Sequence, residues 1–128
     1  MLTNEWKNVE GFSNTGEDYE NIAARRMGDV VQVAYMAFAG LKVVELKGVE
    51  DIVKPDYSNV LDFVNEYGDD WEIGIYVKNG DEVLVVTVDC CSEANDGKNI
   101  ISCVSSEEYD ATMLEELDEE LLELYDLV

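Results

Sequence analysis

The carboxylates with the clearest spacing lie in residues 105–128. This segment reads SSEEYDATMLEELDEELLELYDLV and contains neither Lys nor Arg. Its acidic residues are Glu107, Glu108, Asp110, Glu115, Glu116, Asp118, Glu119, Glu120, Glu123 and Asp126. Carboxylates at this density can bind basic side chains or metal ions, and they repel other anions.

A rotation of about 100° per residue gives this segment two faces. The apolar stripe contains Leu114, Leu117, Leu121, Leu124, Tyr125 and Val128. The opposite face carries Glu115, Glu116, Glu119, Glu120, Glu123 and Asp126. We therefore expect an acidic amphipathic C-terminal helix in residues 105–128, which packs by its leucines and displays its carboxylates.

The acidic face of this helix opposes folding. Pairs such as Glu116 with Glu120 and Glu119 with Glu123 place like charges one turn apart, each at a cost of about 0.2–0.5 kcal/mol. With the helical rise, one carboxylate recurs about every 3 Å, close to the roughly 3.4 Å spacing of phosphates along one DNA strand. This spacing predicts that the helix can imitate a nucleic-acid backbone, and an ordinary solvated face is the alternative.

A second group of acids follows a shorter predicted helix. Ser58 can cap a helix that ends at Gly68, with Val60, Leu61, Val64 and Tyr67 on its inner face. Four carboxylates belong to its outer face or to the loop after it, and we count them as further candidate binding residues: Asp62, Glu66, Asp69 and Asp70.

Net charge restricts the partners. The chain has 128 residues, with 30 acids against 8 bases and a formal net charge of −22. Such a surface repels nucleic acids and anionic membranes, so cationic proteins or metal ions are the expected partners. A hydrophobic fraction of 47% predicts a packed core, and the length predicts one domain over residues 1–128. A general adaptation for solubility would give the same charge.

Catalytic signatures are missing from the sequence. It contains no His and no glycine-rich phosphate loop, so we predict neither enzyme activity nor a cofactor. Residues 93–99 resemble a calcium loop only faintly, because the acidic first ligand is missing. Cys90, Cys91 and Cys103 form no CxxC motif, and we expect reduced thiols rather than a metal site. Without an export signal near Met1, we expect a cytoplasmic protein.

The N-terminal third of the chain is expected to be an arm followed by a helix. The sequence predicts an irregular arm over residues 1–16. A long buried helix then begins after an N-cap at Thr15 and ends at Gly40. The helical spacing rests on apolar residues at three- and four-residue steps: Tyr19, Ile22, Ala23, Met27, Val30, Ala34, Ala37 and Phe38.

The remaining elements are predicted strands. Residues 41–46 favour a short strand, with a continued helix as the alternative, and residues 49–53 favour a strand or a turn. Residues 71–78 and 82–89 form a hairpin around Asn79-Gly80, and 99–104 give a further strand. The predicted fold class is α+β. An antiparallel meander of three to four strands is covered by the long buried helix and the acidic C-terminal helix.

Three function classes are compatible with this sequence. In size, lack of His and carboxylate-rich helices it resembles the small acidic anti-defence proteins of phages and mobile elements, namely DNA mimics and acidic anti-CRISPR proteins. The resemblance implies a cytoplasmic inhibitor that occupies the cationic nucleic-acid-binding surface of a bacterial defence nuclease or CRISPR effector in the host cell. The alternatives are an immunity protein that neutralises a basic toxin, and a non-enzymatic adaptor whose charge maintains solubility. The oligomeric state, monomer or dimer, stays open.

Overall fold

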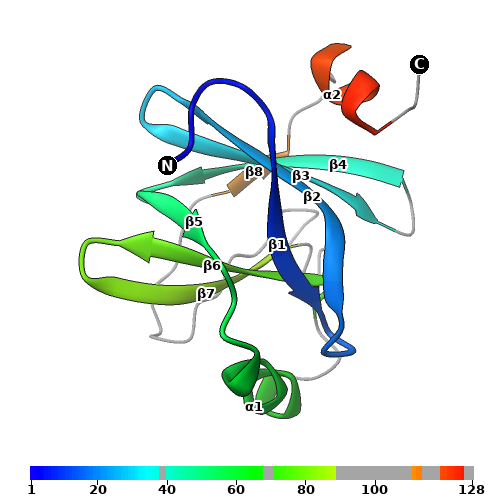
Figure 1. Cartoon of the computed structure of the whole chain (residues 1–128), viewed down its shortest axis with the longest axis vertical. Coiled ribbons are helices and arrows are strands. Elements are labelled where there is room, and N and C mark those ends of the chain that lie inside the picture. Colours follow the sequence, from blue (N-terminus) through cyan, green and yellow to red (C-terminus); the bar gives the residue numbers. More distant parts are fainter. Residues whose placement is uncertain (38–39, 68–70, 89–110, 114–118, 126–128) are drawn as a thin grey trace.

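The protein is built around one curled antiparallel sheet that forms a half-barrel (Figure 1). The computed structural model describes residues 1–37, 40–67, 71–88, 111–113 and 119–125. Within these ranges the elements are β1 (Lys7–Ser13), β2 (Asp18–Met27), β3 (Val30–Ala37), β4 (Gly40–Lys47), β5 (Asp51–Val53), α1 (Tyr57–Tyr67), β6 (Ile73–Asn79), β7 (Glu82–Val88), β8 (Ala111–Met113) and α2 (Glu119–Leu124).

The strand order is β5-β6-β1-β2-β3-β4-β8, and β7 pairs with β6 outside this path. Strand β6 therefore has three neighbours. It pairs with β7 from Ile73 to Asn79, with β1 at Ile73 and Gly74, and with β5 from Tyr76 to Lys78. Because β7 runs along the whole strand, β1 and β5 share the opposite edge of β6.

Side-chain alternation divides the apolar residues between the two faces of the sheet. The inner face forms the largest core, made of Ile22, Ala24, Val31, Val33, Tyr35, Val44, Leu46, Ile73, Ile75, Val77, Leu84, Val86 and Val88, with Leu2 and Val49. Two smaller clusters lie on the outer face. One contains Phe12 and Tyr76 beneath α1, and the other contains Ala34 and Val43 beneath α2.

The predicted α+β class is wrong, because the region expected to be a long helix forms β2, β3 and the start of β4. Gly28, at φ 64°, makes the turn between β2 and β3, and Ala24 pairs with Val33. The fold is mostly β, and within the described residues its sheet has eight strands in place of the expected three or four. The error has a physical cause. Both faces are covered at Ile22, Ala23 and Ala24 of β2 and at residues 31–35 of β3, so polar residues do not alternate with apolar ones there.

The expected irregular arm also contains regular structure, since β1 occupies Lys7–Ser13. Its register against β2 shifts between Val9 and Gly11. A bulge of this kind interrupts the two-residue period that identifies a strand in a sequence.

Several local predictions are confirmed. Residues 41–46 lie in β4, and the predicted hairpin forms as β6 and β7 with Gly80 and Asp81 in its loop. The helix expected over 58–67 forms as α1, which begins at Tyr57. Its predicted inner face is correct for Val60, which is buried, and wrong for Leu61, which is 62% exposed. The expected strand at 99–104 lies outside the described residues. Neither helix in the described ranges is long and apolar enough to cross a bilayer.

Candidate protein-binding surfaces

Helix α2 rests on small side chains of the outer face. Ala23, Ala34 and Val43 form one row across β2, β3 and β4, and all three are buried. Leu121 of α2 is fully buried against Ala34 and Val43. Because alanine projects only a methyl group from the sheet, the leucine can approach the strands closely.

Tyr125, directly after α2, fastens the end of this helix to the sheet. Its hydroxyl lies 3.1 Å from the carbonyl oxygen of Asn21 and 3.0 Å from that of Ala34, to which it can donate. Burial, followed by the nearby Tyr19, raises the pKa of the Tyr125 hydroxyl well above its usual value. The hydroxyl therefore stays protonated and available as a donor across the neutral range.

Trp6 packs against the same cluster, and the side chain of Arg25 lies over its ring. The guanidinium carbon of Arg25 lies 4.4 Å from the centre of the Trp6 ring. The Nε of Arg25 donates a hydrogen bond to Oε1 of Gln32 at 2.7 Å. Arg25 is thus held against the outer face of β2 and β3, beside the surface on which α2 packs.

The carboxylates of α2 point away from the strands on which the helix packs. Glu119, Glu120 and Glu123 are exposed, whereas Leu121 is buried. The predicted sidedness holds for Leu121 against these carboxylates, but Leu124, predicted for the same buried stripe, is 37% exposed. The predicted extent of the helix over residues 105–128 is also wrong, because Ala111–Met113 pair with β4 as strand β8 and the described helix covers Glu119–Leu124. The other predicted members of this face, Glu115, Glu116 and Asp126, lie outside the described residues.

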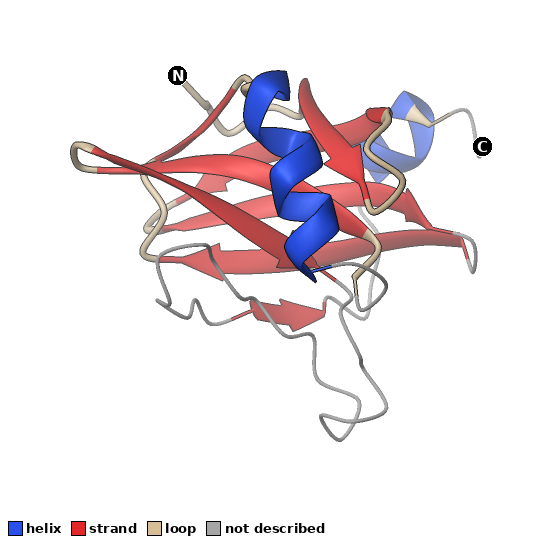
Figure 2. Ribbon diagram, turned by 90° about the horizontal axis from the view of Figure 1, so that it is seen from below, coloured by secondary structure: helices blue, strands red, loops and turns tan. Residues whose placement is uncertain are grey.

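The second candidate surface is α1, which lies across the outer face near β6 and β7 (Figure 2). Its N-cap is Asp56 rather than the predicted Ser58. Asp56 Oδ1 accepts hydrogen bonds from the backbone N of Ser58 at 3.0 Å and from its Oγ at 2.6 Å, and Oδ2 accepts one from Asn59 Nδ2 at 3.1 Å. The hydrogen bonds from Ser58 lower the pKa of the Asp56 carboxyl.

Tyr57, the first residue of α1, faces acidic residues of the N-terminal strands. Partial burial comes first among the causes that raise the pKa of Tyr57 to about 12, followed by a hydrogen bond to Asp18, the charges of Asp18 and Glu10, and a hydrogen bond to Glu10. The start of α1 is therefore held next to β1 and β2 as well as to β6.

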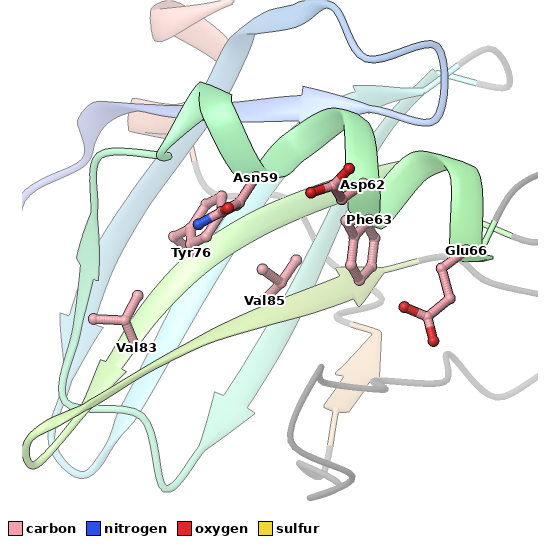
Figure 3. Close-up of a pocket in the computed structure, with 7 residues that line it drawn as sticks. All are labelled: Asn59, Asp62, Phe63, Glu66, Tyr76, Val83 and Val85. Carbon is pink, nitrogen blue, oxygen red and sulfur yellow. The ribbon is translucent and has the colours of Figure 1, made fainter.

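A groove of about 290 Å³ separates α1 from the β6–β7 hairpin. Asn59, Asp62, Phe63 and Glu66 line it from the helix, and Tyr76, Val83 and Val85 line it from the strands (Figure 3). Phe63, Tyr76 and Val85 are buried, whereas Asp62, Glu66 and Val83 are exposed. The groove therefore has an apolar floor and an acidic rim.

The structure separates the two groups of predicted site residues. Asp62 and Glu66 are on α1, at the opposite end of the view from Glu119, Glu120 and Glu123 on α2 (Figure 1). The remaining two candidates, Asp69 and Asp70, lie outside the described residues. The acids of α1 and of α2 therefore form two separate surfaces.

Sequence reasoning missed the apolar side of the groove. Val83 and Val85 belong to the predicted strand 82–89, where Val83, Val85 and Thr87 alternate with Leu84, Val86 and Val88, so that both faces are largely apolar. That pattern was the available signal, because a strand apolar on both faces needs cover on its outer face as well. Nothing in the sequence indicated that α1 would supply this cover while leaving Val83 55% exposed.

Metal binding has no support from the described ranges, which contain no group of three or more Asp, Glu or Cys placed to hold an ion. The chain matches no family model, no curated protein and no solved structure.

Proposed function

We propose that the protein is an acidic inhibitor that binds the cationic nucleic-acid-binding surface of another protein through the outer face of α2. The observation that carries the proposal is the way in which the helix is fixed. Leu121 is fully buried and the Tyr125 hydroxyl reaches two backbone carbonyls, while Glu119 and Glu123 are exposed. Carboxylates on a fixed helix lose little conformational entropy when they bind, which favours affinity.

The electrostatics of α2 also support a cationic partner. Glu119 and Glu120 lie in its first turn, and its last turn carries no basic residue. Glu123 is therefore close both to Glu119 and to the negative end of the helix dipole, and each interaction is unfavourable. A basic side chain from a partner would relieve both. The net charge of −22 would accelerate the encounter and make it sensitive to salt.

The target we infer is a bacterial defence nuclease or CRISPR effector, because such enzymes expose basic surfaces that bind phosphates. This choice of target rests on the resemblance in composition to anti-defence proteins. An immunity protein that blocks a basic toxin would use the same surface and the same physics.

A second candidate function has one observation in its favour. Leu61 is 62% exposed on α1 and Val83 is 55% exposed on β7. Val83 lines the groove, and an exposed apolar side chain at a groove favours a binding module that recognises its partner through apolar contacts. In such an adaptor the acidic helix would serve solubility, and binding would depend little on salt.

Capture of the partner from bacterial lysate would test the proposal. The tagged protein is incubated with lysate at low and high salt, with and without competitor DNA, and retained proteins are identified by mass spectrometry. We expect a nucleic-acid-binding enzyme that is retained at low salt and displaced by DNA. A partner that withstands both treatments would contradict nucleic-acid mimicry and favour the adaptor.

Two double variants then locate the interface. In the first, Glu119→Gln and Glu123→Gln remove two charges from α2. In the matched control, Glu5→Gln and Glu17→Gln remove two charges from exposed positions elsewhere. We expect only the α2 variant to weaken the captured complex strongly and to reduce its salt dependence. Equal losses in both variants would mean that net charge alone, and not α2, governs binding.

A further inference from the structure

The groove beside α1 combines two features that suit one kind of side chain. Asp62 and Glu66 are four residues apart, so their side chains leave the same face of α1 with a rise of about 6 Å between them. Below them, Phe63 is 7%, Tyr76 6% and Val85 5% exposed. A group that enters the groove therefore passes two carboxylates at the rim and meets apolar and aromatic surface at the floor.

The two carboxylates have no cationic partner among the described residues. Two ion pairs of the described residues lie elsewhere, between the N-terminal amine and Asp51 and between Lys54 and Glu10. Asp62 and Glu66 repel each other across one helical turn, and an external cation would remove this repulsion. Val83, 55% exposed at the same groove, gives the rim an apolar contact as well.

We propose that this groove binds an arginine side chain presented by a partner protein. The methylene stem of arginine can lie on Val83 and Val85, as long basic side chains do when they cover apolar surface. Its planar guanidinium has five N–H donors in a rigid fork, so it can donate to both carboxylates while its flat face stacks on an aromatic ring. The ammonium of lysine is a compact point charge with three donors and no flat face, so it fits this combination less well. A volume of about 290 Å³ suits a single long side chain.

This proposal goes beyond the function assigned to α2. The groove is on α1, in a different part of the outer face, and its arginine site does not require the partner to bind nucleic acid. A partner that reached both surfaces would gain affinity from two linked contacts. Each site can fail independently of the other, so each needs its own test.

The probe is N-acetyl-arginine amide, titrated into the full-length protein and followed by the backbone amide signals in NMR. N-acetyl-citrulline amide, which has nearly the same shape without the charge, is the control ligand, and N-acetyl-lysine amide tests the preference for guanidinium. We expect saturable shifts at Asn59, Phe63 and Glu66 and at Tyr76, Val83 and Val85. Citrulline should produce little change, and lysine should bind more weakly than arginine.

Variants connect these shifts to the two carboxylates. The double variant Asp62→Asn with Glu66→Gln should weaken arginine binding about three- to tenfold, the range for losing two partly exposed ion pairs. The double variant Glu119→Gln with Glu123→Gln should leave it unchanged. If the α2 variant lost its partner from lysate while arginine still bound the groove, the two sites would be shown to be separate.

Several results would overturn the proposal. Equal shifts with citrulline would mean that the groove binds apolar stems without using its carboxylates. Shifts that extend without saturation over α1 and α2 together would mean diffuse attraction to a polyanion. Equal affinity for lysine and arginine would remove the argument for a guanidinium site.

Discussion

The ring of Phe12 on β1 lies directly over Gly74 on β6. A Cβ atom at position 74 would come within 2.7 Å of the Phe12 ring. The two residues are paired across the strands, and the same ring makes edge contacts with Phe63, at 5.7 Å between centroids, and with Trp71, at 5.4 Å. The missing side chain at Gly74 therefore lets one aromatic cluster join β1, β6 and α1.

Gly74→Ala should destabilise the protein by about 1–3 kcal/mol, because the added methyl group would displace the Phe12 ring from a packed site. Urea unfolding followed by tryptophan fluorescence measures the effect. Introducing Phe12→Leu into the Gly74→Ala background should cost less than Phe12→Leu alone. Strictly additive losses would show that the ring and the methyl group do not compete for space.

Leu121→Ala should destabilise the protein by about 2–5 kcal/mol, because this side chain is fully buried under α2. Leu124→Ala is the matched control on the same helix, since Leu124 is 37% exposed. Its effect should be clearly smaller in the same denaturant titration. Similar losses for the two variants would contradict the described orientation of α2.

Asp56→Ala should lower the melting temperature at neutral pH, because it removes the N-cap of α1. The pKa of Asp56 is lowered in the folded protein from its ordinary 3.8, so the ionised form is the one that folding favours. The stabilising effect is complete above pH 3.8 and is lost as pH falls through the lower folded pKa. The melting temperatures of the two proteins, compared in steps of pH, should therefore converge in acid. A difference that persisted there would assign the effect to packing instead of charge.

Alkaline pH should unfold the protein through its tyrosines. Burial is the main cause that raises the pKa values of Tyr19, Tyr57, Tyr76 and Tyr125 above 10, and that of Tyr57 reaches about 12. A raised folded pKa means that the corresponding stability is complete below pH 10 and is lost as pH rises above it. Phenolate absorbance should therefore lag behind that of the urea-unfolded chain. Identical titration curves would contradict the burial of these hydroxyls.

The sequence identified the elements with strong local signals. Asn79-Gly80 marked the β6–β7 hairpin, and the helix predicted from Ser58 to Gly68 forms as α1 over Tyr57–Tyr67. The β2–β3 hairpin was missed because its outer face carries Ala23 and Ala34, and alanine favours helices when tertiary contacts are ignored. These residues form strands because β2 pairs with β1 and β3 pairs with β4, and local propensity gives no information about such pairing.

The binding surfaces show the same difference between local sequence signals and tertiary contacts. The sidedness of α2 around Leu121 follows from helical periodicity and was predicted. The groove was not predicted, because Glu66 and Val83 come from elements that meet only through the topology of the sheet. Their proximity depends on where α1 packs, and that depends on the contact between Phe12 and Gly74.

Strand β6 is enclosed on both edges, by β7 on one side and by β1 and β5 on the other. Each of its amide protons exchanges with solvent deuterium only when the strand pairing to which it donates opens. Because β6 is held along both edges, Ile75 and Val77 should report the free energy of global unfolding. Cooperativity is thus concentrated at the strand where β7, β1 and β5 meet. Both helices pack on the outer face of the sheet. They can therefore detach locally while the strands of the half-barrel stay paired.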